Sequence, residues 1–414
     1  MVYTDIKSPY GFVAIEPTLA LERELGVQFD WRPLTLNIPS YLGSARKSQG
    51  EIVASKGRSE RTWKAIKYSY MDARRYAERQ GHILRGTEKI WDSVLLNVAM
   101  MWVCATARER LPEFLTYVFP LFWNRDLDIE DLAVVEACLE ACGVSSAGFA
   151  NYASGDGECR AQHDALQPQL HEHGIYGVPT YVLGGEPLHG REHLPLIRWA
   201  LSGREGPAPD IAYETAPSNT EREHTRVKLD VYVDFKCAGS FLALEPTLAL
   251  VARTGTEIAW HPFSTAERDM PVEGADLEVI ASHHATREVS KRAIHRKYAA
   301  SRDVDLHFPV RTGSADLALG ALTEINGNPL LFIRACFAAY WERHEDLDDP
   351  EVVRELLAAS GVGRSGDLGT ARERFEEAQS RAEEAGIVDA PGYRIADQIF
   401  IGRQHLPWIE ELMR

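Results

Sequence analysis

Two residues able to carry hydroxyl or sulfur chemistry occupy matching positions in this chain. Ser8 lies in the stretch YTDIKSPYG at 3–11, and Cys237 lies in the related stretch YVDFKCAGS at 232–240. An alternating, strand-like segment precedes each residue and a helical pattern follows it, so both side chains are predicted at helix N-termini. Because a helix N-terminus carries about half a positive charge and unpaired N–H groups, it stabilises an anion such as a thiolate.

The two side chains suggest different chemistry. Ser8 has no His–Asp pair near it in sequence to make it a nucleophile, so it is suited to donate its proton to a thiolate brought by a cofactor. Helix capping by Ser8 is the simpler alternative. Cys237 lacks a second cysteine in Cys-Ala-Gly-Ser, which argues against a dithiol cycle. Three interpretations of Cys237 stay open: a reactive thiolate, a replacement for Ser8 in a second thiol site, and a relic in a half kept for packing.

The elements that position these residues form an internal repeat. One constant offset in the numbering matches Asp5 to Asp234, Lys7 to Lys236, Glu16 to Glu245 and Trp31 to Trp260. Later in each copy a second, smaller offset matches Pro179 to Pro391 and Gly190 to Gly402. The helical part of the second copy is therefore shorter than that of the first, while both flanks keep their register.

Each copy predicts a strand–helix–strand opening, a helical insert, and a closing strand and helix. The first domain is predicted at 1–203 with its insert at about 60–170, and the second at 227–414 with its insert at about 276–385. Residues 204–226 are rich in Pro, Ser, Thr and charge without periodicity, which is typical of a linker. The predicted fold class is α/β.

Composition limits the partners. A formal net charge of −16 argues against nucleic acid or an anionic membrane, and no apolar run is long enough to span a bilayer. The N-terminal sequence lacks a signal-peptide pattern, and the six cysteines form no framework, so we expect reduced thiols in the cytoplasm. Cys138 and Cys142 are interpreted as buried apolar residues, and no histidine spacing predicts a metal site.

Four short motifs carry a resemblance to a known family: D-x-x-S-P-Y at 5–10, W-R-P at 31–33, G-V-P-T at 177–180 and G-x-x-x-L at 190–194. The chain resembles the DsbA-like branch of the thioredoxin fold, and within it the 2-hydroxychromene-2-carboxylate isomerases and kappa-class glutathione transferases. The resemblance implies two tandem thioredoxin-like domains, each with an inserted helical subdomain. It also implies glutathione, or another low-molecular-weight thiol, as the cofactor.

The resemblance further implies site residues. Ser8 would be catalytic, with Cys237 as its counterpart in the second copy. Cofactor binding would fall to Pro9, Tyr10, Val178, Pro179, Arg191 and Glu192. The substrate pocket would be lined by Trp31, Tyr68, Asp72 and Arg75. The Val178-Pro179 bond would be cis, with Ala390-Pro391 as its equivalent.

The second copy departs from this pattern at two carboxylates. Where the first copy has Glu192, the second has Gln404. Aligning Tyr76 with Tyr298 places Ile294 opposite Asp72. Both differences predict a second site that has diverged from thiol-cofactor binding.

The sequence therefore favours a thiol-dependent isomerase acting on a small unsaturated carbonyl compound by reversible thiolate addition. A kappa-like transferase, which leaves the thiol on its acceptor, is the first alternative. A non-catalytic thioredoxin-fold binding protein is the second. The two halves are expected to pack as an intrachain pseudo-dimer.

Overall fold

The computed structural model describes residues 1–48, 51–56, 58–213, 228–265, 277–310, 313–364 and 367–413. Residues 214–226 of the predicted linker and residue 276 lie outside these ranges. The chain divides into two compact units. Unit 1 contains residues 1–206 with the described part of 269–292, and unit 2 contains the described parts of 207–268 and 293–414.

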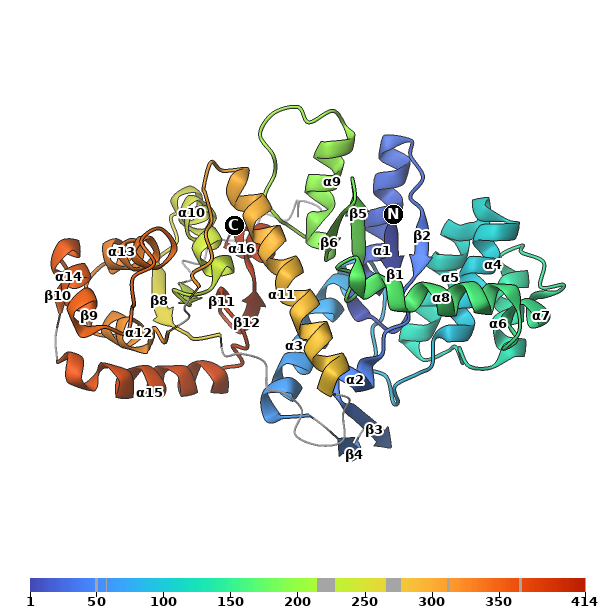
Figure 1. The fold of residues 1–414 in the computed structure, drawn as a ribbon, viewed down its shortest axis with the longest axis horizontal. Helices are drawn as coiled ribbons and strands as arrows, with labels where there is room; N and C mark the ends of the chain where they lie inside the picture. Colours follow the sequence, from blue (N-terminus) through green and yellow to red (C-terminus); the bar gives the residue numbers. More distant parts are fainter. Residues whose placement is uncertain are drawn as a thin grey trace. The chain divides into compact units, whose positions relative to one another are not determined.

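Unit 1 is built on a mixed four-stranded sheet in the order β2-β1-β5-β6 (Figure 1). Its strands are β1 (Val2–Thr4), β2 (Trp31–Pro33), β5 (Thr180–Leu183) and β6 (Glu186–His189). β1 is parallel to β2 and antiparallel to β5, so strands from the two ends of the copy are neighbours. The crossover between the parallel strands is α1 (Pro9–Leu25), and η2 (Arg191–His193) and α9 (Leu194–Leu201) follow β6.

The segment between β2 and β5 is mostly helical, in agreement with the predicted fold class. Its helices are α2 (Ile38–Leu42), α3 (Glu60–Arg79), α4 (Val94–Thr106), η1 (Arg108–Arg110), α5 (Leu111–Asn124), α6 (Leu132–Ala141), α7 (Phe149–Ala153) and α8 (Glu158–Glu172). A hairpin of β3 (Ser44–Ser48) and β4 (Glu51–Lys56) precedes α3 and was not predicted.

Unit 2 repeats the plan with a sheet in the order β12-β11-β7-β8. Its strands are β7 (Leu229–Val233), β8 (Ile258–Pro262), β11 (Gly392–Ile395) and β12 (Gln398–Ile401), with α10 (Ala238–Thr254) as the crossover and η4 (Arg403–His405) and α16 (Leu406–Met413) at the end. Its insert contains α11 (Leu277–Ala300), α12 (Asp316–Leu322), β9 (Ile325–Asn326), α13 (Leu330–Trp341), α14 (Pro350–Ser360), β10 (Gly363–Arg364), η3 (Leu368–Thr370) and α15 (Ala371–Glu384). Two mixed sheets with helical inserts confirm the α/β prediction.

The cores beside the two sheets repeat residue by residue. The two offsets of the sequence repeat match Tyr3, Leu34, Leu170, Ile175 and Val178 of the first core to Tyr232, Phe263, Ala382, Ile387 and Ala390 of the second. Burial of a large apolar side chain stabilises a fold by about 2 kcal/mol, so these matched sets are a substantial part of what holds each sheet to its insert. The sequence repeat is therefore also a repeat of packing.

A second strand follows β5 directly. Residues Glu186–His189 form β6, which pairs antiparallel with β5. Gly184 and Gly185 between the strands have φ values of 59° and 88°. Two successive residues in the left-handed region form the tight hairpin turn that glycine favours, so the Gly-Gly pair continues the sheet.

The burial of two cysteines agrees with a further expectation from the sequence. All six cysteines are free, and Cys138 and Cys142 are buried, as their interpretation as apolar residues predicts. Among the described residues, no helix has the length and apolar character that a membrane span requires.

A first prediction concerns the close approach of α12 and α15. A Cβ added to Gly320 would lie 1.9 Å from the carbonyl oxygen of Ala371, and a backbone atom cannot rotate away. Gly320→Ala should therefore lower the free energy of unfolding of unit 2 by about 3 kcal/mol or more, measured by denaturant titration. Gly363→Ala is the matched control, because no atom lies within 4 Å of its added Cβ. Equal stability of the two variants would contradict the packing described here.

Candidate functional site

Ser8 is the N-cap of α1, as predicted. Its Oγ accepts a hydrogen bond from the Gly11 N–H at 3.0 Å and donates one to the carbonyl oxygen of Val178 at 3.3 Å. Pro9 follows at the first helical position, where its missing N–H is not needed. The Ser8 hydroxyl, 6% exposed, therefore lies between a helix N-terminus and the segment that precedes Pro179.

The Val178-Pro179 peptide bond is cis, as the resemblance implied, and so is Ala390-Pro391 in unit 2. The Pro179 carbonyl accepts from the Gly190 N–H at 2.9 Å, and Thr180 Oγ1 donates to the Gly177 carbonyl at 2.7 Å. Both bonds fix the backbone opposite Ser8.

A buried carboxylate holds the turn that presents Ser8. Asp5, fully buried, accepts from the backbone N–H of Lys7 at 3.2 Å and from that of Leu36 at 2.7 Å. Burial raises the pKa of Asp5, while the nearby Lys7 ammonium opposes the rise. The sequence reasoning did not assign this pair a role, although the D-x-K pattern common to both copies was a signal for it.

Asp72 on α3 is joined to α1 through Tyr10. The Tyr10 hydroxyl donates to Asp72 Oδ2 at 3.0 Å, and Arg75 lies 3.3 Å from Oδ1. Burial raises the pKa of Asp72 to about 6, against the opposing effects of Arg75, Tyr10 and Arg191. The structure thus brings four predicted site residues into one network next to the first turn of α1.

Arg191 belongs to the same network but is only 4% exposed. Its guanidinium lies over the Tyr76 ring, 4.0 Å from the centroid, and donates to the Val13 carbonyl at 2.8 Å. Glu192 is half-buried, and its carboxylate folds back over Gly190, where an added Cβ would lie 2.0 Å from Glu192 Oε2. Of the two predicted charged contacts, Glu192 is the more accessible.

Trp31, one of the predicted pocket residues, lies near the end of α1 that is opposite to Ser8. The Trp31 indole donates to Glu22 Oε1 at 3.2 Å, and Glu22 lies near the C-terminal end of α1, whereas Ser8 caps its start. At 1.5 Å per residue the two ends are about 20 Å apart along α1, so the structure does not bring Trp31 to Ser8. Tyr68 is half-buried on α3, one turn before Asp72.

In unit 2 the Cys237 thiol takes the place of the Ser8 hydroxyl. Its Sγ lies 3.2 Å from the Ala390 carbonyl, and it makes no capping bond to α10. Asp234 repeats Asp5, since it accepts from the Lys236 and Thr265 N–H groups. Burial raises the pKa of Asp234 to about 6, although those two backbone bonds oppose the rise.

The side chains around Arg403 in unit 2 differ from those around its counterpart Arg191 in unit 1. Arg403 lies over Tyr298, at 5.3 Å, as Arg191 lies over Tyr76, which supports the alignment that places Ile294 opposite Asp72. Arg403 also forms a two-pronged ion pair with Asp210, with contacts of 2.9 to 3.0 Å. The carboxylate beside this arginine therefore comes from the segment between the copies.

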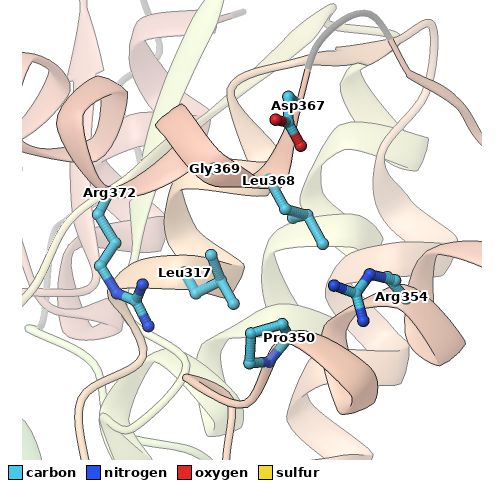
Figure 2. A pocket seen from close by; sticks show the side chains of 7 residues that line it. All are labelled: Leu317, Pro350, Arg354, Asp367, Leu368, Gly369 and Arg372. Atoms are coloured by element: carbon cyan, nitrogen blue, oxygen red, sulfur yellow. The ribbon is translucent and has the colours of Figure 1, made fainter.

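A separate pocket of about 400 Å³ lies in unit 2 (Figure 2). It is lined by Leu317, Pro350, Arg354, Asp367, Leu368, Gly369 and Arg372. Arg372 is ion-paired with Asp348 at 3.0 Å, and none of the predicted site residues lines the pocket. Within the described ranges, no group of three or more His, Cys, Asp or Glu side chains is arranged to hold a metal ion.

A strand, a capped helix, a helical insert and a cis-proline before an antiparallel hairpin define a thioredoxin-like protein of the type with an inserted helical subdomain. The model of the DSBA-like thioredoxin domain matches residues 1–202 and 228–414. The chain belongs to this family, and it carries the domain twice.

Among curated proteins, a 2-hydroxychromene-2-carboxylate isomerase from Sphingobium xenophagum is 26% identical over 200 residues, which cover 45% of this chain and 97% of that protein. A solved structure of selenomethionine 2-hydroxychromene-2-carboxylate isomerase is 18% identical, with a TM-score of 0.35, over 45% of this chain and 94% of that one. A probable DsbA oxidoreductase from Streptomyces coelicolor is 14% identical, with a TM-score of 0.35, over 45% of this chain and 88% of that one.

A second prediction follows from the burial of Asp72. Its folded-state pKa of about 6 exceeds the ordinary value of 3.8, so the protonated form stabilises the fold at low pH. That stabilisation is fully present below about pH 4 and is lost as the pH rises through about 6. The stability of the wild type relative to Asp72→Asn should therefore fall by about 2 kcal/mol between pH 4 and pH 7, measured by denaturant titration.

The control for this titration is Gly363→Ala, which changes no titratable group and whose added Cβ meets no atom within 4 Å. Its stability relative to the wild type should not change over the same pH range. A pH-independent difference for Asp72→Asn would mean that Asp72 is ionised in the folded chain throughout.

Proposed function

We propose that unit 1 is the catalytic part of a cytoplasmic, glutathione-dependent isomerase that acts on an unsaturated carbonyl compound. The observation that carries the proposal is the Ser8 hydroxyl, a helix N-cap 3.3 Å from the carbonyl of the residue before a cis-proline. The distant similarity to a 2-hydroxychromene-2-carboxylate isomerase supports the reaction class. The six free cysteines agree with a reducing compartment.

The residues around Ser8 fit a thiol cofactor. A hydroxyl donor at the positive end of a helix suits a thiolate, and the backbone of Val178 suits the peptide part of a tripeptide. Half-buried Glu192 is the residue we assign to the cofactor's amine. Bound glutathione would supply a thiolate that adds to the unsaturated carbonyl compound and later leaves, so that the double bond re-forms in the other geometry and no thiol is consumed.

The remaining residues would act on the acceptor. Ser8 would turn its O–H from the Val178 carbonyl towards the sulfur, while the Gly11 N–H continues to hold its Oγ. Tyr10, half-buried and next to Ser8 in the chain, would border the acceptor while its single O–H stays donated to Asp72 Oδ2. Asp72 is fully buried and accepts from Tyr10, so it would act as a positioning residue. Arg191 would keep Asp72 in place, because it too is buried in that network.

The third prediction separates an isomerase from a transferase. We expect a cis-unsaturated 2-oxo acid that carries an aromatic ring to convert to its trans isomer in the presence of glutathione, followed by absorbance. Free thiol, titrated over the same time course, should stay constant. Loss of one thiol per product would instead establish the kappa-like transferase, and failure of glutathione to bind at millimolar concentration would favour a non-catalytic binding protein.

The fourth prediction compares the two copies. Ser8→Ala should lower kcat/KM about a hundredfold, because it removes a charge-assisted hydrogen bond to the thiolate. Ser8→Gly should lower it equally while it preserves the helix cap, since glycine is a good N-cap residue. Cys237→Ser should change activity less than twofold. The opposite ranking would assign the reaction to unit 2.

The pseudo-dimer arrangement of the two halves stays a prediction. A mass measurement in solution that gives a single chain would agree with it.

A further inference from the structure

Part of the second copy belongs to the unit that contains Ser8. α11 follows β8 in sequence, yet residues 277–292 group with unit 1 and only residues 293–300 of the helix group with unit 2. In the first copy the aligned helix, α3, lies wholly within unit 1. The two copies therefore use the same helix differently.

Two buried polar side chains of this segment bind the loop before Pro179. His283 Nε2–H donates to the Tyr176 carbonyl at 3.0 Å, and Ser290 Oγ–H donates to the Gly174 carbonyl at 2.9 Å. His283 is 5% exposed and Ser290 is 6% exposed. A helix that lay on the loop by chance would present apolar or solvated side chains, whereas these two satisfy backbone carbonyls in the interior.

Aromatic packing surrounds the first of these bonds. The His283 ring meets the Tyr176 ring edge-on, with centroids 5.8 Å apart, and the His171 ring at 5.7 Å. On its other side, Tyr176 packs against His189 with ring centroids 4.6 Å apart. The Tyr176 ring is thus packed between His283 of α11 and His189 of β6.

His189 continues the contact towards the cis-proline. Burial, followed by the positive charges of Arg287 and Lys291 on α11, lowers the pKa of His189 to about 3, so the ring is neutral near pH 7. A neutral ring can stay buried at 3.2 Å from Thr180 Oγ1, next to Pro179. α11 therefore contacts the segment 174–180 through hydrogen bonds and aromatic packing, and its positive charges act on His189 beside that segment.

We propose that residues 277–292 of α11 are a positioning element for the thiol site of unit 1, supplied by the second copy. His283 and Ser290 hold the backbone of 174–178, and this backbone presents the Val178 carbonyl to Ser8. As a statement about the thiol site, this rests on the function proposed above. The alignment that matches Tyr76 to Tyr298 also matches Tyr68 to Ser290, so the position of a predicted pocket residue in the first copy holds, in the second, a residue that binds the loop of unit 1.

The first test needs no activity. Hydrogen–deuterium exchange is measured on the full chain, over peptides that span 172–182, for the wild type, Ser290→Ala and His283→Ala. Loss of either bond should speed exchange in 174–180 about fivefold, the value of one ordinary hydrogen bond. Ser282→Ala is the matched control, because Ser282 is exposed on the same helix. Unchanged exchange in both variants overturns the proposal, and if His283→Ala fails to fold, Ser290→Ala alone decides.

The second test reads the thiol site. The dissociation constant for glutathione should rise about fivefold in Ser290→Ala and His283→Ala, while kcat at saturating glutathione changes less than twofold. His283→Gln should restore binding, because the glutamine amide can donate to the Tyr176 carbonyl as Nε2 does. Faster exchange with unchanged glutathione affinity would overturn the link to the thiol site. If the wild type does not bind glutathione, the proposed function fails, and the exchange experiment still decides whether α11 holds the loop.

Discussion

The position of Ser8 depends on one buried carboxylate. Asp5 binds the N–H of Lys7 in the turn before α1 and the N–H of Leu36 after β2, so a single side chain ties the start of the helix to the end of the crossover. The Lys7 ammonium completes the arrangement by donating to the Leu36 carbonyl at 2.8 Å. Burial of a carboxylate is costly unless charge-assisted hydrogen bonds offset it, and here two backbone N–H groups and a cation do so. The tie therefore holds the turn before the N-cap, while the Gly11 N–H and the Val178 carbonyl hold the Ser8 hydroxyl itself.

The same tie occurs at Asp234, and the matched core residues occur beside it, so both copies have kept the frame of the fold. The two copies differ in the ionisable side chains that this shared fold carries. In unit 1 Asp72, Tyr10, Arg75 and Arg191 form one network next to the first turn of α1, in which the other three oppose the rise in the pKa of Asp72. In unit 2 the corresponding arginine, Arg403, is paired with Asp210, and the helix position of Asp72 holds Ile294. The two copies therefore share one frame of fold and carry different ionisable side chains on it.

The behaviour of Asp72 illustrates how such a network works. Its carboxyl is buried, so ionisation is disfavoured, yet Arg75 and Arg191 favour it. The balance leaves a pKa of about 6, close enough to neutral pH for the charge of the group to respond to small changes around it. Tyr10, which donates to Asp72, links this carboxyl to the first turn of α1. The site is therefore electrostatically coupled from α3 to the residue next to Ser8.

Local pattern by itself determined much of this protein. The internal repeat with its two offsets, the N-cap at Ser8 and the helical inserts follow from composition and spacing over short stretches, and family resemblance added the cis-prolines at 179 and 391. Only the tertiary structure decided which side chains meet. It buried Arg191 against Tyr76, placed Trp31 near the far end of α1, and gave residues 277–292 to the unit of the other copy. The physical reason is that a helical or strand period tells which residues share a face, whereas the partner of that face is set by packing between segments far apart in the chain.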